Sequence, residues 1–263
     1  MVLFRGDIKC KSLQRRTSLS VILPADNIHY LQGTEEIAEK PYKTLYLLHG
    51  LFGSDDIFLA NTTIQKFAED HNIAVVLPSG ENSFYVDQKE SHKYYGEFIG
   101  RELVEMTRNI FPLSHKKEDT YLAGFSMGGY GAIRNGLKYH DNFGYIGAIS
   151  AALLTDDLHN WGEGDDLLSS KSFAQSCFGD LNKVIGSDMD PKFLIDDLID
   201  NDIEIPKIFM AVGDNDFLYN ENIDYYNYLK SRNVDVEFRC SSGEHTWEFC
   251  NDYIKEFIEW LPL

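Results

Sequence analysis

A serine between two glycines is the feature of this sequence best suited to chemistry. The segment Gly124-Phe125-Ser126-Met127-Gly128 follows a short apolar run typical of a buried strand, and apolar residues at helical spacing come after it. A strand, a tight turn and a helix in this order form a nucleophile elbow. In such a turn the glycines have no side chains to collide with the neighbouring strand and helix, and the serine stands at the top of a sheet. Ser126 is therefore the predicted nucleophile.

An acyl-transfer serine needs a base within hydrogen-bond reach and an acid that orients the base. In the α/β-hydrolase arrangement the chain order is serine, then Asp or Glu, then histidine, each in a turn after a strand. Asp214 and Asp216 follow a predicted strand at residues 208–212, and His245 follows the last predicted strand. We predict that Asp216 is the acid and His245 the base, with Asp214 as the competing acid.

The negative charge that develops on a substrate carbonyl needs preorganised hydrogen-bond donors. The N–H of Met127, the residue after the nucleophile, is one expected donor. The second should come from the glycine-rich turn after the strand at 44–48. Leu51 is the preferred donor in this turn and Phe52 the alternative. His49 is expected to pin the turn by hydrogen bonding rather than to transfer a proton.

Apolar runs alternate with helix-like segments along the chain, which predicts a mostly parallel sheet of about eight strands with helices on both faces. The first two strands are expected to pair antiparallel at the edge of the sheet, with a loop at 25–43 after them. Strands are predicted at 2–11, 17–23, 44–48, 73–77, 121–123, 145–149, 208–212 and 234–240. Helices are predicted at 64–70, 97–110, from 127 onward, 222–230 and 252–260.

The strand–helix rhythm stops between the strands at 145–149 and 208–212. Residues 153–205 contain acidic clusters, such as Asp165-Asp166, among scattered aromatic anchors. Two interpretations stay open, namely a few peripheral helices or a cap over the site, since insertions at the carboxyl ends of strands often shape ligand pockets. No linker-like stretch divides the chain, so one domain spanning 1–263 with a cap-like insertion is expected.

Composition narrows the classes of partner. The 263 residues are 43% hydrophobic and 25% charged, as in ordinary globular proteins, and carry a formal net charge of −18. The electrostatic field of so negatively charged a protein repels nucleic acid and anionic membranes, so a small-molecule substrate is expected. The N-terminus does not look like a signal peptide, and no apolar run is long enough to span a membrane. A cytoplasmic protein without metal or cofactor is predicted, and a homo-oligomer is left open.

Four cysteines are spaced too widely for a zinc or redox motif. They are Cys10, Cys177, Cys240 and Cys250, and all are expected to be free thiols, packed as small apolar groups, in a reducing compartment. Cys250 lies near His245 in the sequence, but packing as a small apolar group is favoured over a redox role.

Several motifs together resemble the tributyrin esterase branch of the esterase D family of α/β-hydrolases, over almost the whole chain. They are residues 47–53 (LLHGLFG), 75–78 with 83–87, 111–114, 124–132, 216–219 and 243–249. The resemblance implies a metal-independent serine carboxylesterase for short acyl esters, in some members acetyl or feruloyl groups on sugars. It also supports Ser126, Asp216 and His245 as the triad. Cys250 departs from the pattern, because an aromatic residue is usual there, and this puts the packing of the last helix in doubt.

Three rival functions use the same scaffold. An S-formylglutathione hydrolase would cleave a thioester, although a strongly acidic enzyme suits an anionic thiol conjugate poorly. An acyltransferase would pass the acyl group to a sugar or alcohol. A catalytically silent binding protein would not need a complete set of triad candidates, so this sequence argues against it.

Overall fold

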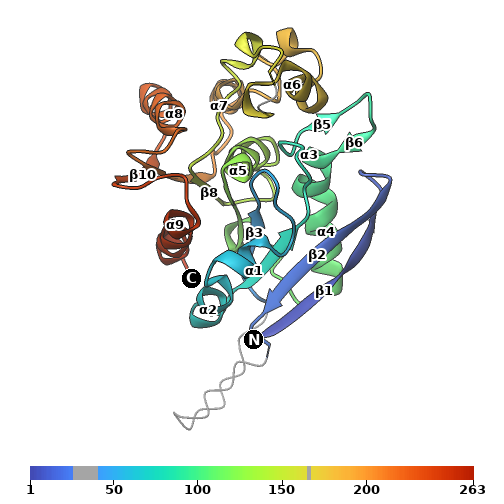
Figure 1. Cartoon of the computed structure of the whole chain (residues 1–263). Coiled ribbons are helices and arrows are strands. Elements are labelled where there is room, and N and C mark those ends of the chain that lie inside the picture. The colour runs from blue at the N-terminus through green and yellow to red at the C-terminus, as the bar shows by residue number, and fades with distance from the viewer. Residues whose placement is uncertain (26–40, 165–166) are drawn as a thin grey trace.

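Short runs of apolar and β-branched residues build the central sheet of the computed structural model, which describes residues 1–25, 41–164 and 167–263. Eight strands lie in the order β1-β2-β4-β3-β7-β8-β9-β10 (Figure 1). Their bounds are β1 (Val2–Cys10), β2 (Arg15–Leu23), β3 (Thr44–Leu48), β4 (Ala74–Pro78), β7 (Thr120–Phe125), β8 (Tyr145–Ile149), β9 (Lys207–Gly213) and β10 (Val236–Ser241).

The pairing confirms the predicted α/β-hydrolase sheet. β1 pairs antiparallel with β2 at one edge, and β2 pairs antiparallel with β4. All remaining neighbours, from β4 through β3, β7, β8 and β9 to β10, are parallel. Parallel strands end at the same edge of a sheet, so the turns after β3, β7, β9 and β10 can gather their side chains in one place. The predicted loop at 25–43 falls mostly on residues 26–40, which lie outside the described residues.

Side chains alternate between the two faces of the sheet, as the pleat requires. In β3, Tyr46 and Leu48 join one buried cluster, whereas Leu45 and Leu47 join the other. The first cluster packs under α4 (Leu103–Ile110), α5 (Met127–Lys138) and α8 (Tyr219–Ser231). The second packs under α1 (Ile57–Asn61), α2 (Ile64–Asp70) and α9 (Trp247–Trp260). Both faces of the sheet are therefore covered, as expected for continuous apolar strands.

Some helix boundaries differ from the prediction. The helix expected at 97–110 is composite, with a turn of α3 (Tyr95–Glu97), a π-helical turn η1 (Phe98–Glu102) and then α4. The last helix begins at Trp247 instead of 252, because the Thr246 side chain caps it by accepting the Phe249 N–H at 3.3 Å. Three small features were not predicted. They are α1, the hairpin of β5 (Asp87–Gln88) and β6 (Lys93–Tyr94), and η2 (Lys117–Asp119), which precedes β7.

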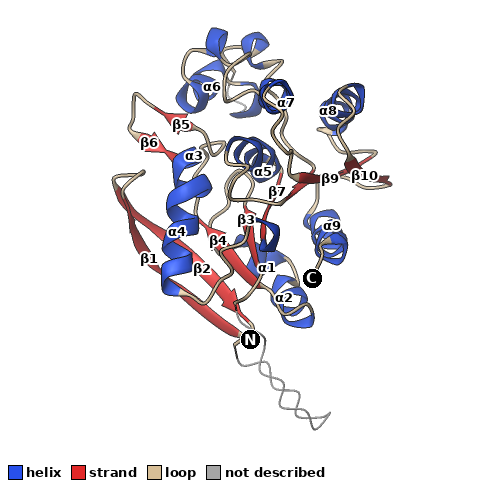
Figure 2. Cartoon of the chain, turned by 180° about the vertical axis from the view of Figure 1, so that it is seen from behind, coloured by secondary structure: helices blue, strands red, loops and turns tan. Residues whose placement is uncertain are grey.

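The segment between β8 and β9 is helical. It contains η3 (Leu158–Asn160), η4 (Leu167–Ser169), α6 (Lys171–Phe178), η5 (Leu181–Lys183) and α7 (Pro191–Asp200). Figures 1 and 2, which view the molecule from opposite sides, both place α6 and α7 beyond α5 at one end of the molecule. The acidic pair at 165–166, noted in the sequence, lies outside the described residues.

A buried cation ties this segment to α5. Arg134 is fully buried, and its guanidinium donates to the carbonyl of Asp188 at 2.8 Å and to its carboxylate at 2.6 Å. Lys138, one turn later, contacts the same carboxylate at 2.6 Å and that of Asp87 at 3.2 Å. A buried charge is tolerated only with such partners, so this network fixes the position of the segment on the core.

All four cysteines are free, as predicted. Cys10, Cys177 and Cys250 are buried as expected, but the expected packing is wrong for Cys240, which is exposed on the edge strand β10. Burial raises the pKa of the Cys10 and Cys177 thiols to about 12 and that of Cys250 well above its usual range, so these three thiols pack as small apolar groups. No helix in the described ranges has the length and apolar character needed to cross a bilayer.

Candidate active site

Ser126 stands in the sharp turn between β7 and α5. Its backbone has φ 58° and ψ −119°, a left-handed conformation that is costly for a residue with a side chain. Hydrogen bonds on both sides hold the turn, because Ser126 N donates to the Ile149 carbonyl at 3.0 Å and its own carbonyl accepts from Ala152 N at 2.9 Å. This is the geometry expected of a nucleophile elbow.

The two glycines of the motif allow the elbow to close. A Cβ on Gly128 would lie 2.0 Å from the Leu48 carbonyl oxygen, and one on Gly124 would lie 2.2 Å from the Gly128 carbonyl oxygen. Both contacts are with backbone atoms, which cannot move aside as a flexible side chain can. The helix therefore approaches the sheet closely only because side chains are missing at these positions.

Asp216 and His245 meet although 29 positions separate them. His245 Nδ1 lies 2.9 Å from Asp216 Oδ2 and 3.1 Å from Oδ1. Asp216 Oδ1 also accepts the Leu218 N–H at 2.8 Å. The carboxylate is buried, and although burial acts to raise its pKa, hydrogen bonds from His245 and the Leu218 amide hold the pKa of Asp216 below its ordinary value. An ionised Asp216 can therefore orient the imidazole.

The loops after β9 and β10 are joined by their own main-chain hydrogen bonds. Asn215 N donates to the Gly243 carbonyl at 2.9 Å, and Gly243 N donates to the Asp214 carboxylate at 3.1 Å. The exposed Asp214 thus binds backbone, whereas Asp216, two residues later, binds the imidazole. The structure brings Asp216, not its competitor, into contact with His245.

Aromatic rings hold the imidazole beside the elbow. The Phe125 ring, on the residue just before Ser126, stacks on the His245 ring with centroids 4.5 Å apart and an interplanar angle of 24°. The Phe217 ring lies 4.6 Å away and is tilted by 47°. Within the described parts of the chain, Ser126 Oγ makes no hydrogen bond to His245, and catalytic hydrogen bonds are often long before substrate binds.

The turn after β3 lies directly against Ser126. A Cβ on Gly50 would be 3.2 Å from Ser126 Cβ and 3.8 Å from Ser126 Oγ. In this turn the Phe52 N–H donates to Asn82 Oδ1 at 2.9 Å, whereas the Leu51 N–H has no acceptor among the residues that the structure describes. Of the two candidate donors, only Leu51 thus keeps its amide available to a ligand.

His49 fixes the turn through both ring nitrogens. Gly80 N–H donates to Nε2 at 2.8 Å, so Nε2 carries no proton and Nδ1–H donates to the Gly50 carbonyl at 2.7 Å. Burial lowers the pKa of His49, which favours this neutral form. Both ring nitrogens are used by the backbone, as the sequence-based interpretation of His49 expected.

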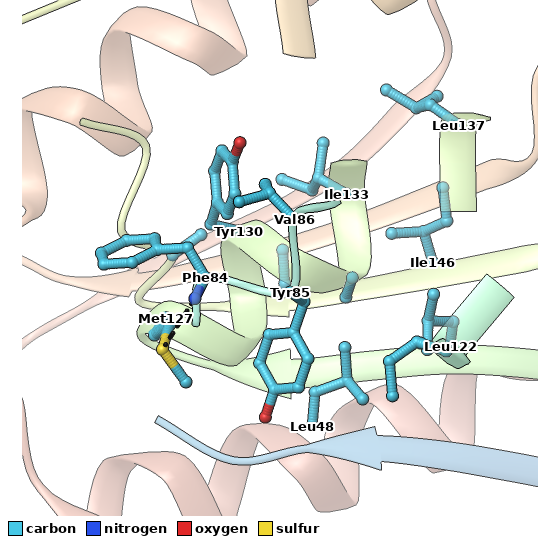
Figure 3. Packing of buried hydrophobic residues seen from close by; sticks show 14 of the residues in the cluster. Leu48, Phe84, Tyr85, Val86, Leu122, Met127, Tyr130, Ile133, Leu137 and Ile146 are labelled. Atoms are coloured by element: carbon cyan, nitrogen blue, oxygen red, sulfur yellow. Dashed lines mark hydrogen bonds between the residues drawn. The ribbon is translucent and has the colours of Figure 1, made fainter. Parts of the chain in front are cut away.

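Met127 carries the other expected donor. It is the first residue of α5, so its N–H has no partner within the helix, and no side chain caps this end. Its side chain is buried, and Met127 Sδ accepts the Phe84 N–H at 3.4 Å (Figure 3). The backbone of Met127 is thereby anchored to the chain that follows β4.

Sequence reasoning missed three contributors to the site. Asn82, Phe125 and Ser150 were not singled out, because their roles depend on contacts across the fold. Ser150 alone left a sign in the sequence, since it directly follows the predicted strand at 145–149. In the structure its backbone has φ 45° and its buried hydroxyl lies near Asp216.

Comparisons with known proteins show the family of this chain. Residues 10–259 match the family described as "Putative esterase". An acetyl esterase from Caldicellulosiruptor saccharolyticus is 41% identical over 262 residues, which are 99% of this chain and 98% of that protein. Among solved structures, the substrate-bound fluorophosphonate-binding serine hydrolase FphF from Staphylococcus aureus has a TM-score of 0.86 and 33% identity over 99% of this chain and 98% of its own. An S-formylglutathione hydrolase from the same organism has a TM-score of 0.84 and 32% identity, with the same coverage. The chain therefore belongs to this esterase family, and it is a serine hydrolase of carboxylic esters with the α/β-hydrolase fold.

Proposed function

We propose that this esterase hydrolyses short-chain acyl esters, of the acetyl to butyryl type, through an acyl-enzyme on Ser126. The observation that carries the mechanism is the Asp216–His245 hydrogen bond, held by a stacked Phe125 ring next to the strained Ser126. The 41% identity to an acetyl esterase supports the short acyl group. Acetyl or feruloyl esters of carbohydrates are the natural substrates that we would test first.

The site residues divide the proposed reaction between them. His245 takes the proton from Ser126 Oγ as this oxygen attacks the ester carbonyl, and Asp216 stabilises the imidazolium that forms. The amides of Leu51 and Met127 bind the oxyanion. When the intermediate collapses, His245 gives the proton to the departing alkoxide, so the alcohol leaves and the acyl-enzyme remains. Water then attacks the acyl carbonyl while His245 takes a proton from the water. His245 returns this proton to Ser126 Oγ as the carboxylic acid leaves.

Replacement of the nucleophile tests this assignment. We expect Ser126→Ala to lower kcat for p-nitrophenyl acetate by about 10⁴-fold or more, with an unchanged melting temperature. A fluorophosphonate probe should label the wild-type protein and not the variant. Retention of most turnover by Ser126→Ala would show that another group is the nucleophile. A series of acyl lengths, with acetylated and feruloylated sugars beside it, would then define the substrate.

A thioester is the second candidate substrate, because one similar structure is an S-formylglutathione hydrolase. The oxyester remains our proposal, since a net charge of −18 disfavours an anionic thiol conjugate. The ratio of kcat/KM for matched oxyester and thioester substrates would decide between them. Product analysis with added alcohol or sugar would detect acyl transfer.

We also propose that residues 153–205 cap the site. Phe173 and Phe178 of α6 pack on Phe84, with ring centroids 6.2 and 5.1 Å apart, and Phe84 N–H binds Met127 beside the elbow. This arrangement supports a cap that shapes the acyl pocket. Exchange of the segment should change the ratio of kcat/KM between acetyl and butyryl esters, and an unchanged ratio would argue for peripheral helices.

The four free thiols support a cytoplasmic location, because disulfides are rare in that reducing compartment. Fractionation of the source cells would test this. A homo-oligomer stays a prediction, which light scattering would check.

A further inference from the structure

We propose that Asn82 is a positioning residue of the oxyanion hole, acting through the Phe52 amide on the neighbouring Leu51 N–H. The inference rests on the proposed function, in which Leu51 supplies one of the two donors. Asn82 belongs to the segment of residues 79–86, here called the 79–86 loop, which follows β4 and touches both turns that carry expected donors.

The turn of residues 50–53 after β3, here called the oxyanion turn, has a residue with a costly backbone conformation in its centre. Gly53 N donates to the Gly50 carbonyl at 3.2 Å, so residues 50–53 form a β-turn with Leu51 and Phe52 in its centre. Phe52 has φ 64°, in the left-handed region where such turns prefer glycine. Its ring is 81% exposed, so packing of the side chain cannot hold this conformation. The hydrogen bond from Phe52 N–H to Asn82 Oδ1 is the contact that can.

The Leu51 N–H is fixed through its own peptide group and the peptide group that follows. The Leu51 N–H and the Gly50 carbonyl belong to one planar trans peptide and point in opposite directions. That carbonyl is held by His49 Nδ1–H at 2.7 Å and by Gly53 N–H. The next peptide carries the Phe52 N–H, which Asn82 holds at 2.9 Å. With both peptide planes held, the Leu51 N–H has one direction, and without Asn82 the second plane is free to rotate.

The 79–86 loop is rigid enough to act as a reference. Ser83 Oγ donates to the Gly80 carbonyl at 2.6 Å and accepts the Tyr85 N–H at 3.1 Å, which closes the loop on itself. The Tyr85 hydroxyl donates to the His49 carbonyl at 2.9 Å, and Phe84 N–H binds Met127 Sδ. One loop thus places both expected donors relative to each other, and Asn82 is its contact with the exposed side of the oxyanion turn.

The loop also contacts the segment between β8 and β9. The Cys177 thiol of α6 donates to the Asn82 carbonyl at 3.2 Å. The backbone of Asn82 is therefore held independently of its side chain. A side-chain substitution should remove the contact with Phe52 while leaving this loop in place.

The test compares Asn82→Leu, which has a similar shape but no acceptor, with Asn82→Asp, which keeps the acceptor oxygen. Loss of one oxyanion donor lowers kcat by about 10²–10³-fold, and a misdirected donor loses part of this. We expect Asn82→Leu to lower kcat for p-nitrophenyl acetate by about 10–100-fold with KM changed less than about 3-fold. Asn82→Asp should stay within about 5-fold of wild type. Rates are taken per site titrated with fluorophosphonate, which removes any unfolded fraction.

A trifluoromethyl ketone supplies a readout that a purely structural role would not move. It forms a hemiketal oxyanion on the serine, so its Ki should rise with Asn82→Leu by the factor by which kcat falls. Asn142→Leu is the matched control, because Asn142 also makes a long-range side-chain bond to backbone, at 2.7 Å to the Gly100 carbonyl, but it precedes β8, at the edge of the sheet opposite the site. It should leave kcat and Ki unchanged.

Three results would overturn the role of Asn82: wild-type kcat in Asn82→Leu, an equal loss in Asn82→Asp, or a loss confined to KM. These outcomes are separable from failure of the proposed function. An active Ser126→Ala variant would remove the proposed mechanism as a whole. An inactive Ser126→Ala beside a fully active Asn82→Leu would remove only the inference on Asn82.

Discussion

Asp216→Asn is expected to reverse the proton arrangement of His245. Asp216 Oδ1 accepts the Leu218 N–H at 2.8 Å, and Oδ2 lies 2.9 Å from His245 Nδ1. An asparagine must keep its oxygen toward the Leu218 amide, so its NH₂ group faces the imidazole. Nδ1 then becomes an acceptor, and the ring proton moves to Nε2, the nitrogen that should receive the proton of Ser126.

The expected fall in kcat follows from the loss of a base in the correct tautomer. Comparable substitutions lower kcat by about 10⁴-fold, which corresponds to about 5.5 kcal/mol of transition-state stabilisation. The loss should appear in kcat for p-nitrophenyl acetate, while KM and the melting temperature change little, because the substituted side chain keeps its shape.

Asp214→Asn is the matched control. Asp214 lies two residues away and is exposed, and among the described residues its carboxylate accepts only the Gly243 N–H and the Asn215 side-chain amide. We expect it to keep kcat within about 5-fold of wild type, since no contact with the imidazole is lost. Near-normal turnover in Asp216→Asn, or an equal loss in Asp214→Asn, would refute the assignment of the acid.

Three further predictions concern stability and accessibility. Gly128→Ala should cost about 3 kcal/mol of unfolding free energy in urea titrations, because its Cβ would lie 2.0 Å from the Leu48 carbonyl oxygen; Gly6→Ala, with open space around it, should be close to neutral. Burial lowers the pKa of His49, so the unfolded chain protonates first, and the urea midpoint should fall as the pH drops below about 6.5; a rise between pH 7 and pH 5 would contradict this. A colorimetric thiol reagent should modify Cys240 alone in the native protein and all four cysteines in denaturant, and rapid native reaction of more than one thiol would contradict the observed burial.

The elbow and the order of the triad candidates could be predicted because their signs are local. A strand, a glycine-flanked serine and a helix occupy one short stretch, and the turns that carry Asp216 and His245 each follow an apolar strand. The choice of Asp216 over Asp214 rested on position alone. The hydrogen bonds to His245 give it a physical reason that no pattern in the sequence contains.

Contacts between distant segments could not be predicted. The hydrogen bond between Phe52 and Asn82 joins residues 30 positions apart, and neither residue type alone indicates it.

Two local features of helices were also missed. The π-helical turn at Phe98–Glu102 keeps helical periodicity, so a helix was predicted without its irregularity. The early start of α9 left a sign in the sequence, since Phe249 and Cys250 continue the buried face of the helix, but the capping role of Thr246 was overlooked.

The aromatic surroundings of His245 have a consequence for the timing of each catalytic cycle. Its ring stacks on Phe125 at 4.5 Å and contacts Phe217 at 4.6 Å, and Phe125 ends a strand that is hydrogen-bonded on both sides. A flip of the imidazole about its side-chain torsion would have to displace one of these rings. The proposed base is therefore oriented before any ester arrives, and little rotational entropy remains to be lost when the proton moves.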